Sequence, residues 1–376
     1  MMASDAAEVI VVGGGVAGGM AACLLAQAGV KVLLLERDEE PRHKICGEFI
    51  SIEAQGYLTR AGLDVAALGA HAVTGMRLIS DCVTVESPLP FIGMGLSRRT
   101  LDAALLERAQ AAGARVCRGA RVLRAAHDQR FVLQVRGIGA VAAPTLFLAT
   151  GKHDLHGWAR QPAHVPEALI GFKMHFHLTP TQATELAQHV ELVIFSAGYA
   201  GLQTVEHGRV NLCLLAERGY MERAGGDWPG LLESLQTESA HLRRRLTGSQ
   251  ALMGNPLTIF RVPYGFVHRA SDDDSDDLYR LGDQAAVTPS FSGDGMAIAL
   301  HSATLAAHAY LMQAGARHYH RCMRRDVLAQ IRTAGALYAM GRSAVGRRMI
   351  LATAQLWPRS LELAARLTRL RCAPAR

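Results

Sequence analysis

The fold is decided by residues 8–19, EVIVVGGGVAGG, in which a run of β-branched residues passes directly into closely spaced glycines. The apolar run 8–12 is typical of a buried parallel strand. Residues 20–28 are rich in alanine and leucine and end at Gly29, which predicts a helix with a glycine C-cap. Residues 30–35 predict a second strand that ends at Glu36. Strand, glycine turn, helix and strand in this order predict a parallel α/β nucleotide-binding unit.

The glycine spacing Gly13-x-Gly15-x-x-Gly18 indicates a dinucleotide ligand. Glycines at these positions allow a tight turn, the approach of backbone N–H groups to a pyrophosphate, and close packing of helix on strand. The helix N-terminus then faces the phosphates, where its dipole favours negative charge. Glu36 is expected to accept both ribose hydroxyls of an adenosine at the end of the second strand. A glycine-rich turn without a ligand is the alternative.

Two further glycine motifs lie late in the chain, LYRLGD at 278–283 and PSFSGDGM at 289–296, followed by a helix of small residues over 297–309. In these motifs and their order the chain resembles the group A FAD monooxygenases and geranylgeranyl-reductase-like enzymes, which carry Gly-Asp and Pro-x-x-Gly-x-Gly at these places. Here three residues instead of two separate Pro289 from Gly293. The resemblance implies that FAD binds, with Asp283 bonded to its ribityl chain and the backbone of 293–296 at the N1 and O2 edge of the flavin. A helix N-terminus there would stabilise the negative charge of reduced flavin.

Shorter motifs between these landmarks carry the same resemblance. Segment 44–48, KICGE, matches the Lys-x-Cys-Gly segment beside the flavin in the geranylgeranyl-reductase-like branch. Arg98 is either a phosphate-neutralising residue, as at the family's Arg-x-x-Phe-Asp helix start, or a solvated helix arginine. Gly151 follows the strand 146–149, without the Asp-Gly pair of many aromatic hydroxylases. The residues expected at the cofactor are Gly13, Gly15, Gly18, Glu36, Arg37, Lys44, Cys46, Gly47, Arg98, Gly151, Gly282, Asp283, Pro289, Gly293, Gly295 and Met296.

The middle of the chain predicts a substrate domain. The expected elements are strands over 168–178, 190–196, 199–206 and 209–216, a hairpin turn at Gly208, and a helix over 228–246. In the family this antiparallel sheet forms a wall of the substrate cavity, so Tyr199 and the loop residue His153 are expected near the substrate. Segment 199–202 replaces the Gly-Tyr-x-Trp-x-x-Pro segment of prenyl reductases but lacks its Trp and Pro. We assign no obligatory catalytic side chain; Cys46 is a flavin-proximal candidate or a small buried hydrophobe.

Composition limits the other classes. The 376 residues are 49% hydrophobic and 19% charged, which excludes a disordered chain. The seven cysteines are scattered and odd in number, which excludes a disulfide scaffold and favours a reducing cytoplasm. We expect no signal peptide and no membrane-spanning segment. His175 and His177 share one face of a predicted strand without a third ligand, so we expect partly solvated histidines and no metal.

The positive charge is concentrated at the C-terminus. Residues 315–376 hold thirteen arginines against Asp326 and Glu362, a net charge of +11, whereas the whole chain carries +7, so the rest of the chain is net negative. Because aromatic residues are few there, we do not expect nucleic acid as a partner. The helical pattern of this region is interrupted at Trp357 and Pro358. The region is expected either to pack over the cofactor domain or to form a basic amphipathic surface that makes peripheral contact with a membrane.

Together these patterns predict an α/β protein with a Rossmann-type FAD-binding domain built on a parallel sheet (1–75, 95–160 and 275–315), an antiparallel-sheet substrate domain (76–94 and 161–274) and a C-terminal basic helical region (316–376). The expected function is that of an FAD-dependent oxidoreductase with NAD(P)H as transient electron donor. Hydroxylation of a hydrophobic or aromatic small molecule with O₂ is favoured. The alternatives are a geranylgeranyl-reductase-like enzyme that saturates C=C bonds and a non-catalytic flavin-binding sensor or assembly protein.

Overall fold

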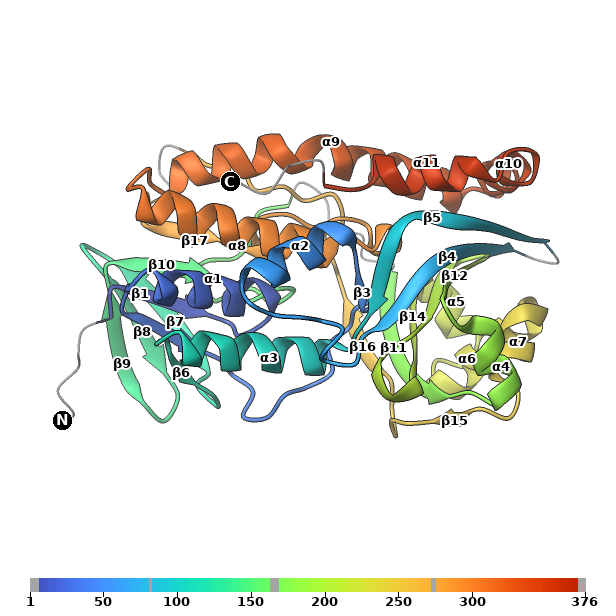
Figure 1. The fold of residues 1–376 in the computed structure, drawn as a ribbon, viewed down its shortest axis with the longest axis horizontal. Helices are drawn as coiled ribbons and strands as arrows, with labels where there is room; N and C mark the ends of the chain where they lie inside the picture. Colours follow the sequence, from blue (N-terminus) through green and yellow to red (C-terminus); the bar gives the residue numbers. More distant parts are fainter. Residues whose placement is uncertain (1–6, 81–82, 163–168, 272–274, 371–376) are drawn as a thin grey trace.

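The computed structural model describes residues 7–80, 83–162, 169–271 and 275–370. Figure 1 shows three parts: a parallel sheet with its helices at one end, a large curved sheet at the other, and the C-terminal helices along one side of both. The α/β architecture predicted from the sequence is confirmed.

The first sheet is entirely parallel, with the strand order β17-β10-β1-β2-β6. Its strands are β1 (Val9–Val12), β2 (Val32–Leu35), β6 (Arg115–Cys117), β10 (Thr145–Leu148) and β17 (Leu278–Arg280). Successive side chains of β1 point to opposite faces. Val9 and Val11 pack with the helices α1 (Val16–Gln27), α3 (Arg98–Ala111) and α8 (Gly295–Leu311). Ile10 and Val12 pack on the other face, so the strand is buried on both sides.

A three-stranded sheet that the sequence did not predict covers that other face. It consists of β7 (Val122–His127), β8 (Phe131–Val135) and β9 (Gly139–Ala143). Phe131, Leu133 and Val135 of its central strand are buried against Ile10 and Val12 of β1. The first domain therefore has three layers: helices, parallel sheet and small antiparallel sheet.

The second sheet has nine strands in the order β15-β11-β14-β13-β12-β4-β5-β3, with β16 also pairing with β11. All neighbours are antiparallel except β12 and β4. The strands are β3 (Phe49–Ile50), β4 (His71–Ser80), β5 (Val83–Gly95), β11 (Leu169–His177), β12 (His189–Phe195), β13 (Gly198–Thr204), β14 (Val210–Glu217), β15 (Gln250–Ala251) and β16 (Leu257–Phe260). In chain order the first strand of this sheet is β3, which precedes β4 by about twenty residues.

Short helices pack beside the second sheet: α4 (Pro180–Leu186), α5 (Arg218–Arg223), α6 (Trp228–Glu238) and α7 (Ala240–Leu246). The single helix predicted over 228–246 is wrong. Ser239 has extended backbone and its hydroxyl accepts a hydrogen bond from the N–H of Leu242 at 3.2 Å, so a new helix begins there.

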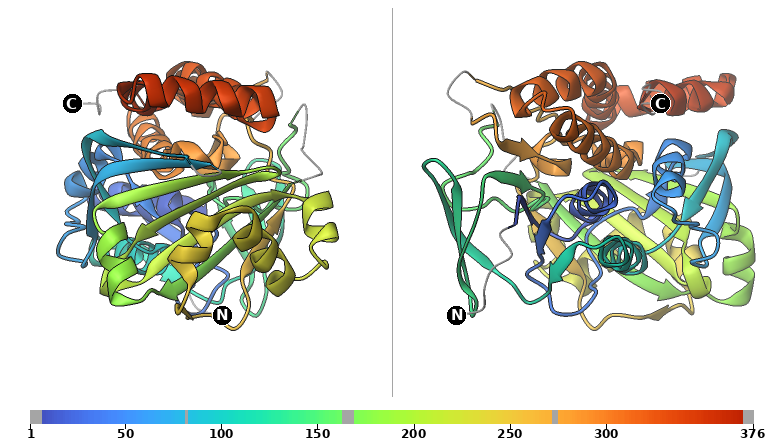
Figure 2. Two further views of the ribbon diagram at one scale, coloured as in Figure 1. Left: turned by 90° about the vertical axis from the view of Figure 1, so that its right-hand side faces the viewer. Right: turned by 60° about the vertical axis from the view of Figure 1, so that its left-hand side comes forward.

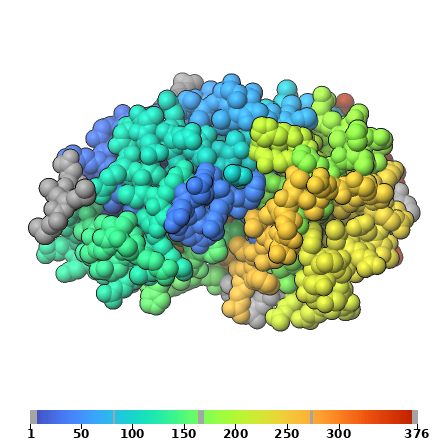
Figure 3. All heavy atoms as spheres, turned by 90° about the horizontal axis from the view of Figure 1, so that it is seen from below, coloured from blue at the N-terminus to red at the C-terminus, as the bar shows by residue number. Residues whose placement is uncertain are grey.

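The C-terminal region forms α9 (Ala316–Arg342), α10 (Ala344–Leu356) and α11 (Arg359–Leu367). Helix α9 packs on α8 and β17, whereas α10 and α11 pack on β5, as the views in Figure 2 also show. The predicted interruption at Trp357 and Pro358 is confirmed, and Ser343 makes a second one by capping α10. Figure 3 shows the face opposite to the C-terminal helices, where the loop after β2 lies between α3 and the residues around 255. In the parts of the chain that the structure describes, no helix is long and apolar enough to cross a membrane.

Candidate active site

The glycine turn after β1 requires glycine at two positions because other backbone lies against it. Gly13 has φ +104°, and a Cβ placed there would lie 2.4 Å from the carbonyl oxygen of Ala149. A Cβ on Gly18 would lie 1.8 Å from the carbonyl oxygen of Gly13. These glycines therefore bring α1 close to the ends of β1 and β10. Gly15 is the N-cap of α1 and lies at the front of the turn.

Glu36 lies at the end of β2 and is buried, with 6% of its surface exposed. Its Oε2 accepts a hydrogen bond from the N–H of Gly14 at 2.5 Å, and its Oε1 accepts one from the N–H of Asp38 at 3.0 Å. The carboxylate thus holds the glycine turn, and its contact with ribose hydroxyls stays a prediction. Arg37 is half exposed and its Nε lies 3.9 Å from a carboxylate oxygen of Asp38.

A cavity of about 140 Å³ lies in front of the glycine turn. The predicted cofactor residues that line it are Gly15, Cys46, Gly47, Arg98, Gly151, Gly282, Asp283, Gly293, Gly295 and Met296. The predicted residues that do not line it are Gly13, Gly18, Glu36, Arg37, Lys44 and Pro289. Segments from the two ends of the chain therefore meet at one cavity.

Both α1 and α8 begin at this cavity. The N-cap residues Gly15 and Asp294 make no side-chain capping bond to their own helices. The first N–H groups of each helix are therefore available to an anion, and the helix dipoles favour negative charge there. A diphosphate at α1 and a ring that becomes negative on reduction at α8 both fit this arrangement.

Arg98 and Lys44 place positive charge beside the glycine turn. The guanidinium of Arg98 binds both carboxylate oxygens of Asp102, at 2.9 and 3.0 Å, and Lys44 binds the same carboxylate at 3.0 Å. A Cβ on Gly15 would lie 3.2 Å from the guanidinium of Arg98. Two cations thus share one carboxylate, and the side chain of Arg98 is only 16% exposed. This geometry favours the phosphate-neutralising interpretation over a solvated arginine.

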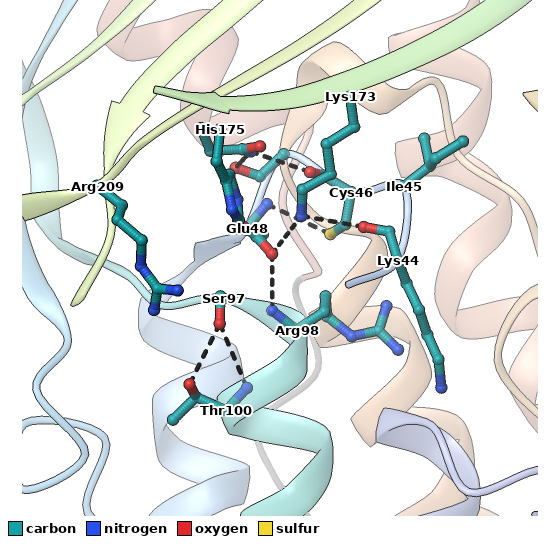
Figure 4. A network of polar contacts seen from close by, with 12 residues as sticks. Lys44, Ile45, Cys46, Glu48, Ser97, Arg98, Thr100, Lys173, His175 and Arg209 are labelled. Atoms are coloured by element: carbon teal, nitrogen blue, oxygen red, sulfur yellow. Dashed lines mark hydrogen bonds and ion pairs between the residues drawn. The ribbon is translucent and has the colours of Figure 1, made fainter. Parts of the chain in front are cut away.

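Glu48, which the sequence analysis did not single out as a site residue, is the centre of a buried ion-pair network that Figure 4 shows. It is fully buried and has φ +62°, which is unusual for a residue with a side chain. Its carboxylate binds the ammonium of Lys173, His175 Nε2 at 2.8 Å and the N–H of Arg98 at 2.8 Å. Burial alone would raise the pKa of Glu48, but the charge of Lys173 and the hydrogen bond with His175 outweigh it and lower that pKa to about 2.

The same network fixes the backbone of the segment 44–47. The ammonium groups of Lys173 and Lys152 donate to the carbonyl oxygens of residues 44 and 45, at 3.0 and 2.8 Å. The amide of Asn211 donates to the carbonyls of residues 46 and 47, at 3.0 and 2.9 Å, and Gln203 donates to the latter at 2.9 Å. Strands of the second sheet therefore hold the segment that lines the cavity. Lys173, Gln203 and Asn211 are polar residues within apolar strands, and that was the sequence signal for them.

The expectation that His175 is partly solvated is wrong. His175 is 1% exposed because Glu48 gives its ring a partner inside the protein, whereas His177 is exposed. Ligand atoms of His43, Glu48 and His175 lie within 4.8 Å of one another, as a metal site would require. The ammonium of Lys173 already pairs with Glu48, however, so a metal ion would meet a cation at close range. We therefore interpret the cluster as an ion-pair network.

A second cavity of about 270 Å³ adjoins the first. Its walls come mainly from apolar side chains of β12, β13, β14 and the C-terminal helices. Tyr199 lines it, with its ring edge-on to Phe291 at 6.3 Å between centroids, and burial raises the pKa of Tyr199 well above its usual value. His153 is exposed and does not line either cavity. The residues common to both cavities are Cys46, Gly47, Phe49, Lys152, Tyr264 and Ser290.

The end of the described chain is attached to the start of α8 through Asp294. This fully buried carboxylate accepts hydrogen bonds from the amide of Gln330, from the N–H of Leu370 at 2.9 Å and from the guanidinium of Arg369 at 3.2 Å. Burial raises the pKa of Asp294 to about 6, although Arg369 opposes the shift. Arg369 also lies over the ring of Phe49, 5.2 Å from its centroid.

Comparison with known proteins agrees with this geometry. Residues 6–136 match the family model described as FAD binding domain. The chain is a flavoprotein whose N-terminal part, residues 6–136, is similar to this family. Its expected resemblance to the group A and geranylgeranyl-reductase-like flavoproteins is confirmed, and the coarse activity is that of an FAD-dependent oxidoreductase.

Three similar proteins span much of the flavoprotein. It is 26% identical over 323 residues to menaquinone reductase from Mycolicibacterium smegmatis, which covers 82% of this chain and 77% of that protein. It is 33% identical over 219 residues to digeranylgeranylglycerophospholipid reductase 2 from Methanopyrus kandleri, with 55% and 54% covered. The fold is similar to that of halogenase PltM in complex with phloroglucinol and FAD, with a TM-score of 0.72 at 16% identity over 96% of this chain and 85% of that one.

Proposed function

We propose that this flavoprotein reduces carbon–carbon double bonds of a long apolar, isoprenoid-like molecule. The observation that carries the proposal is the apolar second cavity, which shares lining residues with the cavity that the predicted cofactor residues line. A cavity of this kind holds a hydrocarbon chain by excluding water and gives little to bind a compact polar substrate. The similarity to reductases named for menaquinone and for a digeranylgeranyl lipid supports the same substrate class.

FAD, when bound, supplies hydride chemistry, and we propose NAD(P)H as the source of its electrons. Reduction of a double bond breaks its π bond and forms two C–H bonds, one from a hydride and one from a proton. The protein must therefore hold the double bond at the junction of the two cavities and provide a proton there.

Four proton-bearing side chains lie at this junction, those of Cys46, Lys152, Tyr264 and Ser290. The thiol of Cys46 lines both cavities, and its sulfur accepts a hydrogen bond from the N–H of Glu48 at 3.3 Å. The hydroxyl of Tyr264 lies 2.7 Å from that of Ser290, and burial raises the pKa of Tyr264, which keeps the hydroxyl protonated at neutral pH. We assign the proton transfer to Cys46, whose position is fixed by the bonds to the carbonyls of its own segment.

Hydroxylation is the second candidate. The absence of the prenyl-reductase Trp and Pro from segment 199–202 favours it, and a dry cavity would equally serve an oxygen transfer from reduced flavin and O₂. In that reaction one oxygen atom enters the product and the other leaves as water.

The two reactions are separated by the mass of the product. The purified holoprotein is mixed with a short-chain menaquinone or geranylgeranyl diphosphate, and separately with a panel of phenols, using NADH or NADPH under argon and under air. A gain of two hydrogens under argon supports the reductase, and Cys46→Ser should then lower turnover while FAD remains bound. A gain of one oxygen that requires air would replace the proposal with hydroxylation. A flavin that neither donor reduces would remove both.

A further inference from the structure

The outward face of α10 is apolar and uncovered. Val345 is 67% exposed, Met349 58% and Leu356 89%. Their spacing, four and then seven residues, places them on one side of the helix. Residues on the other side, such as Leu351 and Ala354, are buried in the cluster that packs on β5. The helix is therefore apolar on both faces. A helix whose outer face met only water would be expected to carry polar residues there.

The apolar surface continues beyond α10. Trp357, at the end of this helix, is 51% exposed, and Leu363 and Leu367 on the outer side of α11 are 43% and 37% exposed. We call the exposed apolar side chains of Val345, Met349, Leu356, Trp357, Leu363 and Leu367 the outer patch.

Arginines surround the outer patch. Arg348, Arg359 and Arg366 are exposed along α10 and α11, and Arg342 is exposed at the end of α9. Glu362 is the single carboxylate within residues 344–367, all of which the structure describes, and it pairs with Arg366 at 2.6 Å. An apolar stripe edged with arginine matches the acyl chains and the anionic headgroups of a lipid bilayer. A second copy of the chain would instead bring arginines against arginines.

We propose that the outer patch docks on an anionic lipid bilayer. The apolar side chains enter the headgroup region, Trp357 lies at the interface, and the arginines bind lipid phosphates. Figure 1 shows α10 and α11 at one edge of the molecule, on the side opposite the face in Figure 3, so contact there leaves α3 and the loop after β2 free of lipid.

The inner sides of the same helices line the second cavity through Ile350, Leu361 and Ala364. Among the lining residues, Arg342 and Glu217 have side chains 52% and 41% exposed and pair at 3.1 Å, which places this part of the cavity at the protein surface. Docking would bring that opening to the bilayer, so an isoprenoid substrate could pass from lipid to cavity without crossing water. This last step rests on the proposed function, whereas binding to lipid does not.

The test is co-sedimentation of the holoprotein with vesicles of phosphatidylcholine alone or mixed with phosphatidylglycerol. We expect binding to the anionic vesicles, a blue shift of tryptophan emission that Trp357→Phe removes, and weakening by salt. Met349→Glu/Leu356→Glu should weaken binding about tenfold or more, because two apolar side chains are lost from the contact. Arg348→Glu/Arg359→Glu should reduce binding to the anionic vesicles specifically.

The matched control is Ile138→Glu, since Ile138 is 52% exposed in the turn between β8 and β9, far from the patch, and this variant should bind as the unaltered protein does. Retained FAD and an unchanged circular dichroism spectrum show that each variant is folded. No sedimentation with anionic vesicles, or equal binding by Met349→Glu/Leu356→Glu, would overturn the proposal. A dimer in analytical ultracentrifugation that this double variant converts to monomer, without vesicle binding, would assign the patch to a second copy. Because the assay uses no substrate, its failure leaves the proposed reaction standing.

Discussion

Replacement of Glu48 by glutamine tests the buried network directly. The carboxylate and the ammonium of Lys173 are both fully buried, so Glu48→Gln leaves an ammonium without its counter-charge inside the protein. Removing one partner of a buried ion pair costs about 3–5 kcal/mol, and we expect a loss of that size in the free energy of unfolding. Lys173→Met in the same chain removes the stranded charge. The double variant should therefore lose less than the two single variants together, by about 2 kcal/mol or more.

The stabilisation by Glu48 depends on pH with a defined sign. The pKa of Glu48 is lowered from 4.5 to about 2 in the folded protein. A depressed carboxyl pKa stabilises the fold above its unfolded value, and that stabilisation is lost as the pH falls through the folded value. The difference in unfolding free energy between the unaltered protein and Glu48→Gln should thus be full above pH 4.5 and shrink toward pH 2.

The assay is urea unfolding followed by circular dichroism and by flavin fluorescence. The control is Glu86→Gln, which breaks the pair with Arg77 at 2.7 Å where the glutamate is 55% exposed. We expect that control to cost under about 1 kcal/mol, because surface ion pairs contribute little. A cost for Glu48→Gln no larger than that for Glu86→Gln, or strictly additive losses in the double variant with Lys173→Met, would contradict a buried, coupled ion pair.

Three further changes probe the cofactor cavity. Gly18→Ala should abolish FAD retention on gel filtration, because the new Cβ would lie 1.8 Å from the carbonyl oxygen of Gly13. The control Gly56→Ala, whose Cβ would have open space around it, should retain FAD. Retention of FAD by both variants would contradict the packing argument. Asp283→Ala should release FAD because Asp283 lines the cavity, and full occupancy would remove its assigned role. The pKa of Asp294 is raised to about 6, so its contribution to stability is present below pH 3.8 and lost as the pH rises through about 6. Chemical denaturation from pH 4 to 7 should show that loss, and Asp294→Asn should remove it; identical pH profiles would contradict the assignment.

The sequence was sufficient for the parts of the fold that depend on neighbouring residues. The turn at Gly13, Gly15 and Gly18 could be predicted because strand, turn and helix follow each other in sequence. Gly18 meets the backbone of Gly13 five residues away, and Gly13 meets the backbone of Ala149 just after β10. The capping serines at 239 and 343 are also local signals, each three residues before the N–H that it caps.

The network around Glu48 could not be predicted in the same way. Lys173 and His175 lie more than a hundred residues from Glu48, and their strand looks like an ordinary apolar strand with three polar positions. Only the packing of the second sheet on the segment 44–48 decides which buried polar residues contact Glu48. The exposure of the outer patch could not be predicted for a different reason. Apolar periodicity in a helix is the same whether the apolar face is buried or exposed.

The bonds between Asp294 and the last described residues have a consequence for any shortened form of the protein. Deleting Arg369 and Leu370 would remove two hydrogen-bond donors from the buried carboxylate of Asp294, at the N-terminus of α8, which begins at the first cavity. Loss of these residues, remote in sequence from every nucleotide motif, should therefore lower the flavin content of the purified protein and with it the yellow colour.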